Sequence, residues 1–403
     1  MSLQENDPAA FELMDREVRF RAEVLDLVPS DNHPSPAVRE AERYPLFYSE
    51  NDGRNYYYPA CETVAEVEKL AGERALRCFP GAEHVNVKPT DGTRGNEATY
   101  RAVLEEGDTI LSLGLAEGGH LSHGLKWNYS GQLYKIVHYG LTPDGLLDMS
   151  EVRRLALEHR PDMIIAGGSS CPFQFDFAAF GDIARESGAM LHADISHFAG
   201  LVVSGHHPSP FPHADTVMTT LQKTLRGLKG AVVFSRELHK AALNRAVFPG
   251  VMAHATGAQL LAKAICFGEA EQPAFKEMVG RVVGNAKRLA AVLIDRGYEL
   301  VAGGTDTHLM IVDVRSRGLT GKEAEARLQA GGLLANKQLV PNDPEKPTVC
   351  SGIRLGTPCS AARGMGETEM DRVAGWIDAL LKGGDADLVR AEVADLAREF
   401  PVP

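Results

Sequence analysis

Residues 163–194 read MIIAGGSSCPFQFDFAAFGDIARESGAMLHAD, with a short apolar run on each side of an amphipathic stretch. This alternation continues along the chain from about Glu83, and the apolar runs tend to end in Gly, Asp, Ser, Thr or His. The rhythm is typical of an α/β domain. Most runs are too apolar on both faces for a half-exposed antiparallel sheet, so we expect a mainly parallel sheet covered by helices. The predicted strands are 85–87, 109–113, 135–139, 163–166, 189–193, 216–219 and 231–234.

The pattern changes after Pro249, where long helices are predicted. Apolar residues recur at helical spacing through 279–294, and Gly297 offers a helix stop. A predicted strand at 308–314 follows, with predicted helices at 321–329 and 370–381. These elements indicate a smaller α+β unit at the C-terminus. The length of 403 residues agrees with this, since it favours two domains or one large domain with an appendage.

Composition narrows the class of protein. With 44% hydrophobic and 24% charged residues, the chain has the composition of a soluble globular protein. It has no long apolar stretch and an acidic N-terminus, so we expect a cytoplasmic protein without a membrane span or secretion signal. The net charge of −12, without a basic block, argues against a nucleic-acid partner. The 6 cysteines form no CxxC pair, which favours reduced thiols over disulfides or a zinc site.

Ligands of open parallel sheets bind beyond the carboxyl ends of the strands, so the polar residues there are candidates for function. Lys223 follows the run 216–220 among hydroxyl and glycine residues. Such a lysine can form a Schiff base with an aldehyde cofactor, although a surface lysine in a loop is the more common interpretation. Asp194 ends another apolar run and can keep a pyridinium ring protonated, or it can cap the following segment.

Three other segments carry candidate residues. Residues 90–96, TDGTRGN, lie between a strand and a helix and suit a phosphate, or form an ordinary helix start. His120 and His123 have a spacing that can bind a metal, but no convincing third ligand is near, and stacking on an aromatic cofactor suits one histidine equally well. Arg354 suits bidentate capture of a carboxylate, with a surface ion pair as the alternative.

Together these segments resemble the serine hydroxymethyltransferase family, whose members are fold type I enzymes that use pyridoxal 5′-phosphate. The resemblance runs from about residue 27 to residue 381, and no metal is implied. The matching segments are YY at 57–58 followed by CE at 61–62, GGHLSHG at 118–124, HFAGL at 197–201, VFPG at 247–250, GGTD at 303–306, LTGKEA at 319–324, VPNDP at 340–344 and SGIR at 351–354. The resemblance implies an N-terminal arm with dimer contacts at 1–60, a large cofactor-binding domain at 61–265 and a small α+β C-terminal domain at 266–403.

The same resemblance implies how the cofactor is bound. Lys223 matches the Schiff-base lysine, Asp194 the partner of the pyridine nitrogen, and His120 the residue that stacks on the ring. The remaining cofactor contacts implied are Ser169 near the phenolic oxygen, His197 close by, and Gly92 and Thr93 at the phosphate.

The substrate contacts implied by the resemblance come from two subunits. Arg354 and Ser30 would bind the substrate carboxylate. Glu50 matches the glutamate that handles protons on the substrate hydroxyl and on the folate. In the family, Glu50 and the tyrosines matching Tyr48 and Tyr58 reach the active site from the neighbouring subunit. An obligate homodimer is therefore implied, and pairing of two dimers into a tetramer stays open.

The sequence departs from the family pattern at several positions around the cofactor and folate sites. Gln222 stands where the family usually has His, Asp91 replaces a serine beside the phosphate, and Gln338 replaces the asparagine that contacts the pterin. The other departures are Leu-Lys for Pro-Arg at 228–229, MAHA for Gln-Gly-Gly-Pro at 252–255, and Pro-Ala for Gly-Gly at 59–60.

Three hypotheses about function follow. The first is interconversion of serine and glycine, with tetrahydrofolate as the one-carbon carrier. The second, which the departures motivate, is a folate-independent aldolase or transaldolase acting on a threonine-like or α-methylserine-like amino acid. The third is a catalytically silent relative that binds a partner or nucleic acid. The retention of Lys223, Asp194, His120 and Arg354 argues against it.

Overall fold

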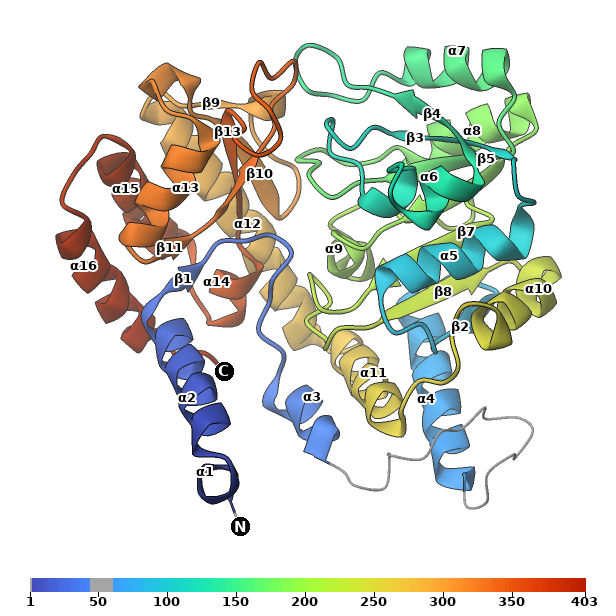
Figure 1. The fold of residues 1–403 in the computed structure, drawn as a ribbon, viewed down its shortest axis with the longest axis horizontal. Helices are drawn as coiled ribbons and strands as arrows, with labels where there is room; N and C mark the ends of the chain where they lie inside the picture. The colour runs from blue at the N-terminus through green and yellow to red at the C-terminus, as the bar shows by residue number, and fades with distance from the viewer. Residues whose placement is uncertain (1, 44–60) are drawn as a thin grey trace.

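The large unit is built on one seven-stranded sheet. The structure, a computed structural model, describes residues 2–43 and 61–403 (Figure 1). The strands are β2 (His84–Asn86), β3 (Thr109–Leu113), β4 (Lys135–Tyr139), β5 (Met163–Gly167), β6 (Met190–Asp194), β7 (Thr216–Thr220) and β8 (Ala231–Ser235), in the order β2-β8-β7-β6-β5-β3-β4. β8 runs antiparallel to both of its neighbours, and the other adjacent pairs are parallel. The mainly parallel α/β sheet expected from the sequence is thus confirmed, and each predicted strand lies within about one residue of an observed one.

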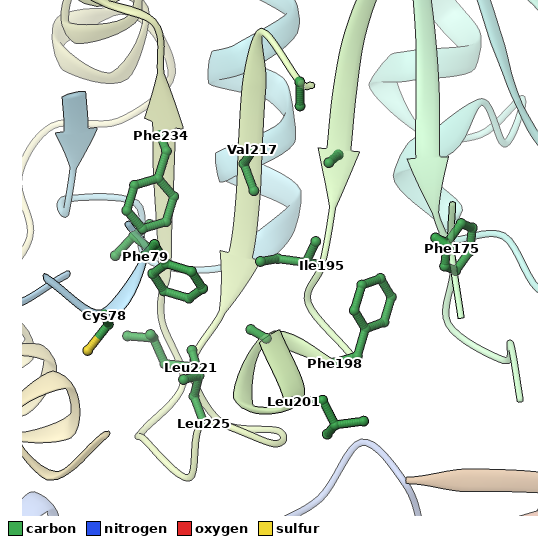
Figure 2. Packing of buried hydrophobic residues seen from close by; sticks show 14 of the residues in the cluster. Cys78, Phe79, Phe175, Ile195, Phe198, Leu201, Val217, Leu221, Leu225 and Phe234 are labelled. Atoms are coloured by element: carbon green, nitrogen blue, oxygen red, sulfur yellow. The ribbon is translucent and has the colours of Figure 1, made fainter. Parts of the chain in front are cut away.

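Helices cover the sheet and complete its core. They are α3 (Pro36–Glu40), α4 (Glu62–Cys78), α5 (Gly92–Val103), α6 (Tyr129–Leu133), α7 (Met149–His159), α8 (Phe177–Ser187), α9 (Ala199–Ser204), α10 (Lys240–Arg245) and α11 (Gly257–Ala270). Aromatic rings fill the space between the sheet and the helices: Phe79 packs on Phe234 with ring centroids 5.0 Å apart, and Phe175 stacks on Phe198 at 5.5 Å (Figure 2). Burial of such rings anchors the loops that follow the strands.

The C-terminal unit has its own sheet and core. β9 (Glu299–Leu300), β10 (Leu309–Asp313), β12 (Asn336–Gln338) and β13 (Gly352–Gly356) pair antiparallel in the order β12-β13-β10-β9. The helices here are α13 (Gly321–Ala330), α14 (Pro358–Ala362), α15 (Glu367–Leu381) and α16 (Ala386–Glu399). The α+β character predicted for this part of the chain is confirmed.

The N-terminal segment packs on the C-terminal unit. After α1 (Leu3–Asn6) and α2 (Pro8–Glu23), the short strand β1 (Leu25–Asp26) pairs in parallel with β11 (Leu333–Leu334). Leu25 and Leu27 join the same hydrophobic cluster as Leu333. The chain then continues to Ser30, so pairing with β11 fixes where Ser30 lies.

One long helix, α12 (Pro273–Asp295), links the two cores. Its first half, including Phe275 and Val279, joins the cluster of the large unit, and its second half, including Leu289 and Leu293, joins the C-terminal cluster. Gly297 follows in a left-handed conformation with φ of 81°, as expected for a helix stop. The domain boundary expected between residues 265 and 266 stays a prediction.

Two global features complete the fold. None of the 6 cysteines, all of which lie in the described residues, forms a disulfide, and all are buried. Among residues 2–43 and 61–403, no helix is both long enough and apolar enough to cross a membrane.

Candidate active site

A cavity of about 350 Å³ opens at the carboxyl-end edge of the large sheet. Its walls come from the segments that follow β2, β3, β5, β6 and β7, together with Ser30 and β13. The site residues predicted from the sequence that line it are Ser30, Gly92, Thr93, His120, Ser169, Asp194, His197, Lys223 and Arg354. The other three predicted residues, Tyr48, Glu50 and Tyr58, lie outside the described residues. Parallel strands place their carboxyl ends at one edge of the sheet, and this brings segments that are far apart in the sequence together around the cavity.

Asp194 is a buried carboxylate with three donors. Oδ2 accepts hydrogen bonds from Asn96 Nδ2 and His123 Nε2, both at 3.0 Å, and Oδ1 accepts one from the Ser196 N–H at 3.1 Å. Burial alone would raise the pKa of Asp194, but the hydrogen bonds and charges of its neighbours, His123 first among them, hold the pKa well below its usual value. Asp194 is therefore a fixed negative charge at the floor of the cavity.

His123 forms a hydrogen bond with Asp194. Its Nδ1 accepts the His120 N–H at 3.3 Å, so its ring proton is on Nε2, which faces Asp194. The described residues contain no cluster of His, Cys, Asp and Glu side chains suited to a metal ion. The spacing of His120 and His123 thus places one ring at the cavity wall and the other beneath Asp194.

His120 presents a neutral ring to the cavity. Its Nδ1 accepts the Ser122 N–H at 3.2 Å and lies 2.7 Å from Ser122 Oγ, which leaves the ring proton on Nε2. Burial and then the neighbouring His123 lower the pKa of His120 to about 4. A neutral imidazole of this kind can pack against an aromatic ring without adding charge.

Lys223 is buried, with 9% of its surface exposed, which excludes the surface-loop interpretation. Burial lowers its pKa to about 8, and the charge of Asp194 opposes this effect. No described residue forms a hydrogen bond with its Nζ, while its backbone oxygen accepts one from Asn32 Nδ2 at 2.8 Å. The backbone of Lys223 is thus held in place, and its amine stays free to react.

The N-terminus of α5 forms another wall of the cavity. The first N–H groups of a helix have no partner inside the helix, so Gly92 and Thr93 can offer donors to an anion. A Cβ on Gly92 would lie 2.7 Å from Thr220 Cγ2, which explains why glycine is needed where α5 approaches the end of β7. Asp91 caps the helix by accepting the Arg94 N–H at 3.0 Å.

Arg354 reaches the cavity from β13 of the C-terminal sheet. It donates from Nη1 to the Ser169 carbonyl at 2.7 Å and to Ser170 Oγ at 3.1 Å, and from Nε to Asn336 Oδ1 at 3.3 Å. Within the part of the chain that the structure describes, Nη2 makes no hydrogen bond and no carboxylate pairs with this guanidinium. The side chain is 8% exposed, so the surface ion pair considered from the sequence is wrong.

Sequence reasoning missed several residues of this site. Ser196, Met218 and Thr220 line the cavity, and Asn96 and His308 support it from behind. His308 stacks on His197 with ring centroids 5.5 Å apart and Nε2 3.3 Å from His197 Nδ1, and burial lowers the pKa of His308 to about 3. The position of Asn96, one helical turn after Gly92, is a signal that could have revealed its inward direction.

Comparison with known proteins identifies the family. The sequence model of the family described as "Serine hydroxymethyltransferase" matches residues 3–377. The chain is 47% identical over 399 residues to "Serine hydroxymethyltransferase 1" of Pseudomonas aeruginosa, covering 96% of this chain and 95% of that protein. It is 43% identical over 409 residues to "Serine hydroxymethyltransferase" of Acidobacterium capsulatum, covering 100% of this chain and 96% of that protein.

The chain belongs to the serine hydroxymethyltransferase family.

The side chains in the cavity fit the cofactor of serine hydroxymethyltransferases, pyridoxal 5′-phosphate. The cavity offers one free buried amine, one ionised carboxylate, a neutral imidazole and the start of a helix. These groups match the aldehyde, the pyridine nitrogen, the aromatic ring and the phosphate of that cofactor.

Three residues that depart from the serine hydroxymethyltransferase pattern lie in or near the walls of the cavity or in the segment 252–255. Gln222 lines the cavity, and its Oε1 is buried without a hydrogen-bond partner among the described residues. Gln338 Oε1 accepts a hydrogen bond from Ser170 Oγ at 2.9 Å, and the same hydroxyl accepts one from Arg354 Nη1. Gln338 therefore helps to hold Arg354 in place. His254, in the altered segment, packs on Phe248 with ring centroids 4.5 Å apart.

Proposed function

We propose that this chain interconverts serine and glycine as a pyridoxal 5′-phosphate-dependent hydroxymethyltransferase, with tetrahydrofolate as the one-carbon carrier. The observation that carries the proposal is the meeting of Lys223, Asp194 and Arg354 in one cavity. The amine can hold the cofactor, the carboxylate can keep its ring protonated, and the guanidinium can bind an amino-acid carboxylate. Full-length similarity to proteins named serine hydroxymethyltransferase favours this reaction over the folate-independent aldolase.

The cofactor contacts we propose follow from the walls of the cavity. Lys223 would hold the aldehyde, Asp194 the ring nitrogen, and His120 one face of the ring. Further contacts come from Ser169 and His197 at the phenolic oxygen and from Gly92 and Thr93 at the phosphate. When bound, the cofactor supplies a ring that takes up the electron pair released when the bond between Cα and Cβ breaks.

The remaining steps use the side chains of the protein. Arg354 would bind the substrate carboxylate through Nη2, with Ser30 beside it, and thereby fix the orientation of the substrate amine. The Lys223 amine, with its pKa lowered to about 8, can accept and return a proton at Nζ near neutral pH. Glu50 would move the proton of the substrate hydroxyl.

We also propose a homodimer in which Glu50, Tyr48 and Tyr58 complete the site of the neighbouring subunit, in line with their assignment from the family resemblance. A cytoplasmic location fits the acidic composition and the small amino-acid substrate.

The deciding experiment measures glycine formation from L-serine by the cofactor-loaded protein, with and without tetrahydrofolate. We expect strong dependence on tetrahydrofolate, and loss of turnover in Lys223→Ala. Folate-independent cleavage of L-allo-threonine or α-methylserine, with L-serine inert, would contradict the proposal. A purified protein that binds no cofactor would instead support a catalytically silent relative.

A further inference from the structure

Lys263 is a buried lysine outside the cavity. It lies on α11, with 3% of its surface exposed. Its Nζ donates to three backbone carbonyls, those of Val87 at 2.6 Å, Pro89 at 2.7 Å and Ala231 at 3.0 Å. Three acceptors match the three N–H groups of an ammonium ion, whereas a neutral amine would leave one carbonyl facing a lone pair. The geometry therefore favours the charged form of Lys263.

These carbonyls belong to the two segments that shape the site. Val87 and Pro89 lie in the segment between β2 and the start of α5, where Gly92 and Thr93 stand. Ala231 is the first residue of β8, where the loop that carries Lys223 ends. The ammonium of Lys263 thus joins the segment that leads to the start of α5 to the end of the loop that carries Lys223.

One further contact ties the two segments together at this point, and another closes the loop that carries Lys223. The Ala231 N–H donates to the Pro89 carbonyl at 3.0 Å, and the Leu221 N–H donates to the Gly230 carbonyl at 3.0 Å. A Cβ on Gly230 would lie 3.0 Å from Lys263 Cε, so the glycine lets the lysine stem pass close beneath the loop. Loss of the Lys263 bonds would leave three buried carbonyls without this donor.

The charge of Lys263 also bears on the phosphate end of the cavity. Burial lowers its pKa to about 7, while the charges of Glu68 and Asp91 and the three carbonyl acceptors favour the ammonium form. Asp91, which replaces a serine of the family pattern, adds a negative charge where an anion is expected. The start of α5 and the ammonium of Lys263 are two positive features that offset it.

We propose that Lys263 is a positioning residue that sets the spacing between the phosphate-binding start of α5 and the Lys223 loop, and so makes binding of the cofactor phosphate possible. This inference rests on the proposed function, because it requires a phosphorylated aldehyde cofactor. Lys263 itself touches neither cofactor nor substrate.

The test compares pyridoxal 5′-phosphate with pyridoxal, which has the same aldehyde and ring but no phosphate. Both ligands are titrated by absorbance into the apoprotein of wild type, Lys263→Met and the control Lys276→Met, in which an exposed lysine of α12 is replaced. We expect Lys263→Met to weaken binding of the phosphorylated ligand by about 10- to 100-fold, because the loss of three charge-assisted bonds releases the start of α5 from the Lys223 loop. Binding of pyridoxal, which has no phosphate, should weaken by less than about threefold. The control should leave both affinities unchanged.

Other outcomes decide against the inference. An equal loss of affinity for the two ligands, or no loss for the phosphorylated one, would overturn it. Lys263→Gln, which keeps amide donors, covers the case in which Lys263→Met does not fold. If Lys263→Gln also fails to fold, even with saturating cofactor, Lys263 is a folding residue and the inference is wrong. Wild-type protein that binds neither ligand would refute the proposed function and this inference with it, whereas normal binding by wild type and variants refutes only this inference.

Discussion

The carboxylate of Asp194 lies 3.0 Å from Nε2 of His123, and both side chains are almost fully buried. The two residues are separated by 71 positions in the sequence: Asp194 ends β6, and His123 lies in a short 3-10 helix after β3. His123 is oriented in turn by the backbone N–H of His120, so one short segment supplies both a ring at the cavity wall and the support of the carboxylate. The negative charge at the cavity floor is therefore built into the folded protein.

Replacing Asp194 by Asn should remove this charge with little change of shape. We expect turnover to fall by about 100- to 1000-fold, because an electrostatic contact to the reacting system is lost. The cofactor should still bind, which an absorbance spectrum of the purified variant would report. Asp182→Asn, at an exposed site on α8, is the matched control and should keep full activity. An Asp194→Asn variant with near wild-type turnover would contradict the assigned role.

Lys223 should show a lowered pKa in its reaction with the cofactor aldehyde. Because burial lowers the pKa to about 8, about half of the amine is neutral at pH 8, and the neutral fraction levels off about one pH unit higher. The rate of cofactor uptake by the apoprotein, followed by absorbance, should have the same profile. A simple lysine derivative, with a pKa of about 10.4, serves as the reference and should still gain rate there. If the rate of cofactor uptake by the protein rises with pH in parallel with the reference, the pKa of Lys223 is not lowered.

Gly92→Ala should disturb the approach of α5 to β7. The new Cβ would lie 2.7 Å from Thr220 Cγ2, so α5 has to shift, at a cost of about 1–3 kcal/mol in the free energy of unfolding. The shift of α5 should also weaken cofactor binding, so less cofactor should stay with the variant during gel filtration. Gly280→Ala inside α12 is the control, because its Cβ would have ordinary contacts and should stabilise the helix by about 0.5–1 kcal/mol. Equal thermal shifts for the two variants would rule out the steric explanation.

Arg354→Lys should separate substrate binding from cofactor binding. Lysine keeps the positive charge but loses the planar fork that holds Ser169, Ser170 and Asn336. We expect KM for L-serine to rise about 10- to 100-fold while cofactor affinity stays within about twofold. Methylamine, which lacks a carboxylate, should react equally well with both proteins. If Arg354→Lys reacted with methylamine as poorly as with L-serine, the substitution would have damaged the cofactor site rather than the site for the substrate carboxylate.

Much of the fold follows from the sequence because the buried strands are short apolar runs with polar ends. Lys223 and Asp194 could be proposed as site residues for the same reason, since Asp194 ends such a run and Lys223 lies three residues after another. The antiparallel direction of β8 could not be predicted, because a buried run has the same pattern in either direction.

The supporting contacts were harder to predict for two physical reasons. His123 binds the carboxylate of Asp194, which lies far away in the sequence at the end of β6. The spacing of His123 from His120 is, by itself, equally compatible with a metal site. Lys263 binds backbone carbonyls, which carry no residue-type signal in the sequence. A lysine inside an apolar helix indicates only that some partner is needed.

Helix α12 has a consequence for how the chain unfolds. At 23 residues it is about 35 Å long, and its two halves belong to different hydrophobic clusters. Melting either cluster removes the packing that stabilises half of a continuous helix, and the loss spreads along its hydrogen bonds to the other half. The two cores should therefore melt as one cooperative unit, and calorimetry of the protein should record a single heat-absorption peak.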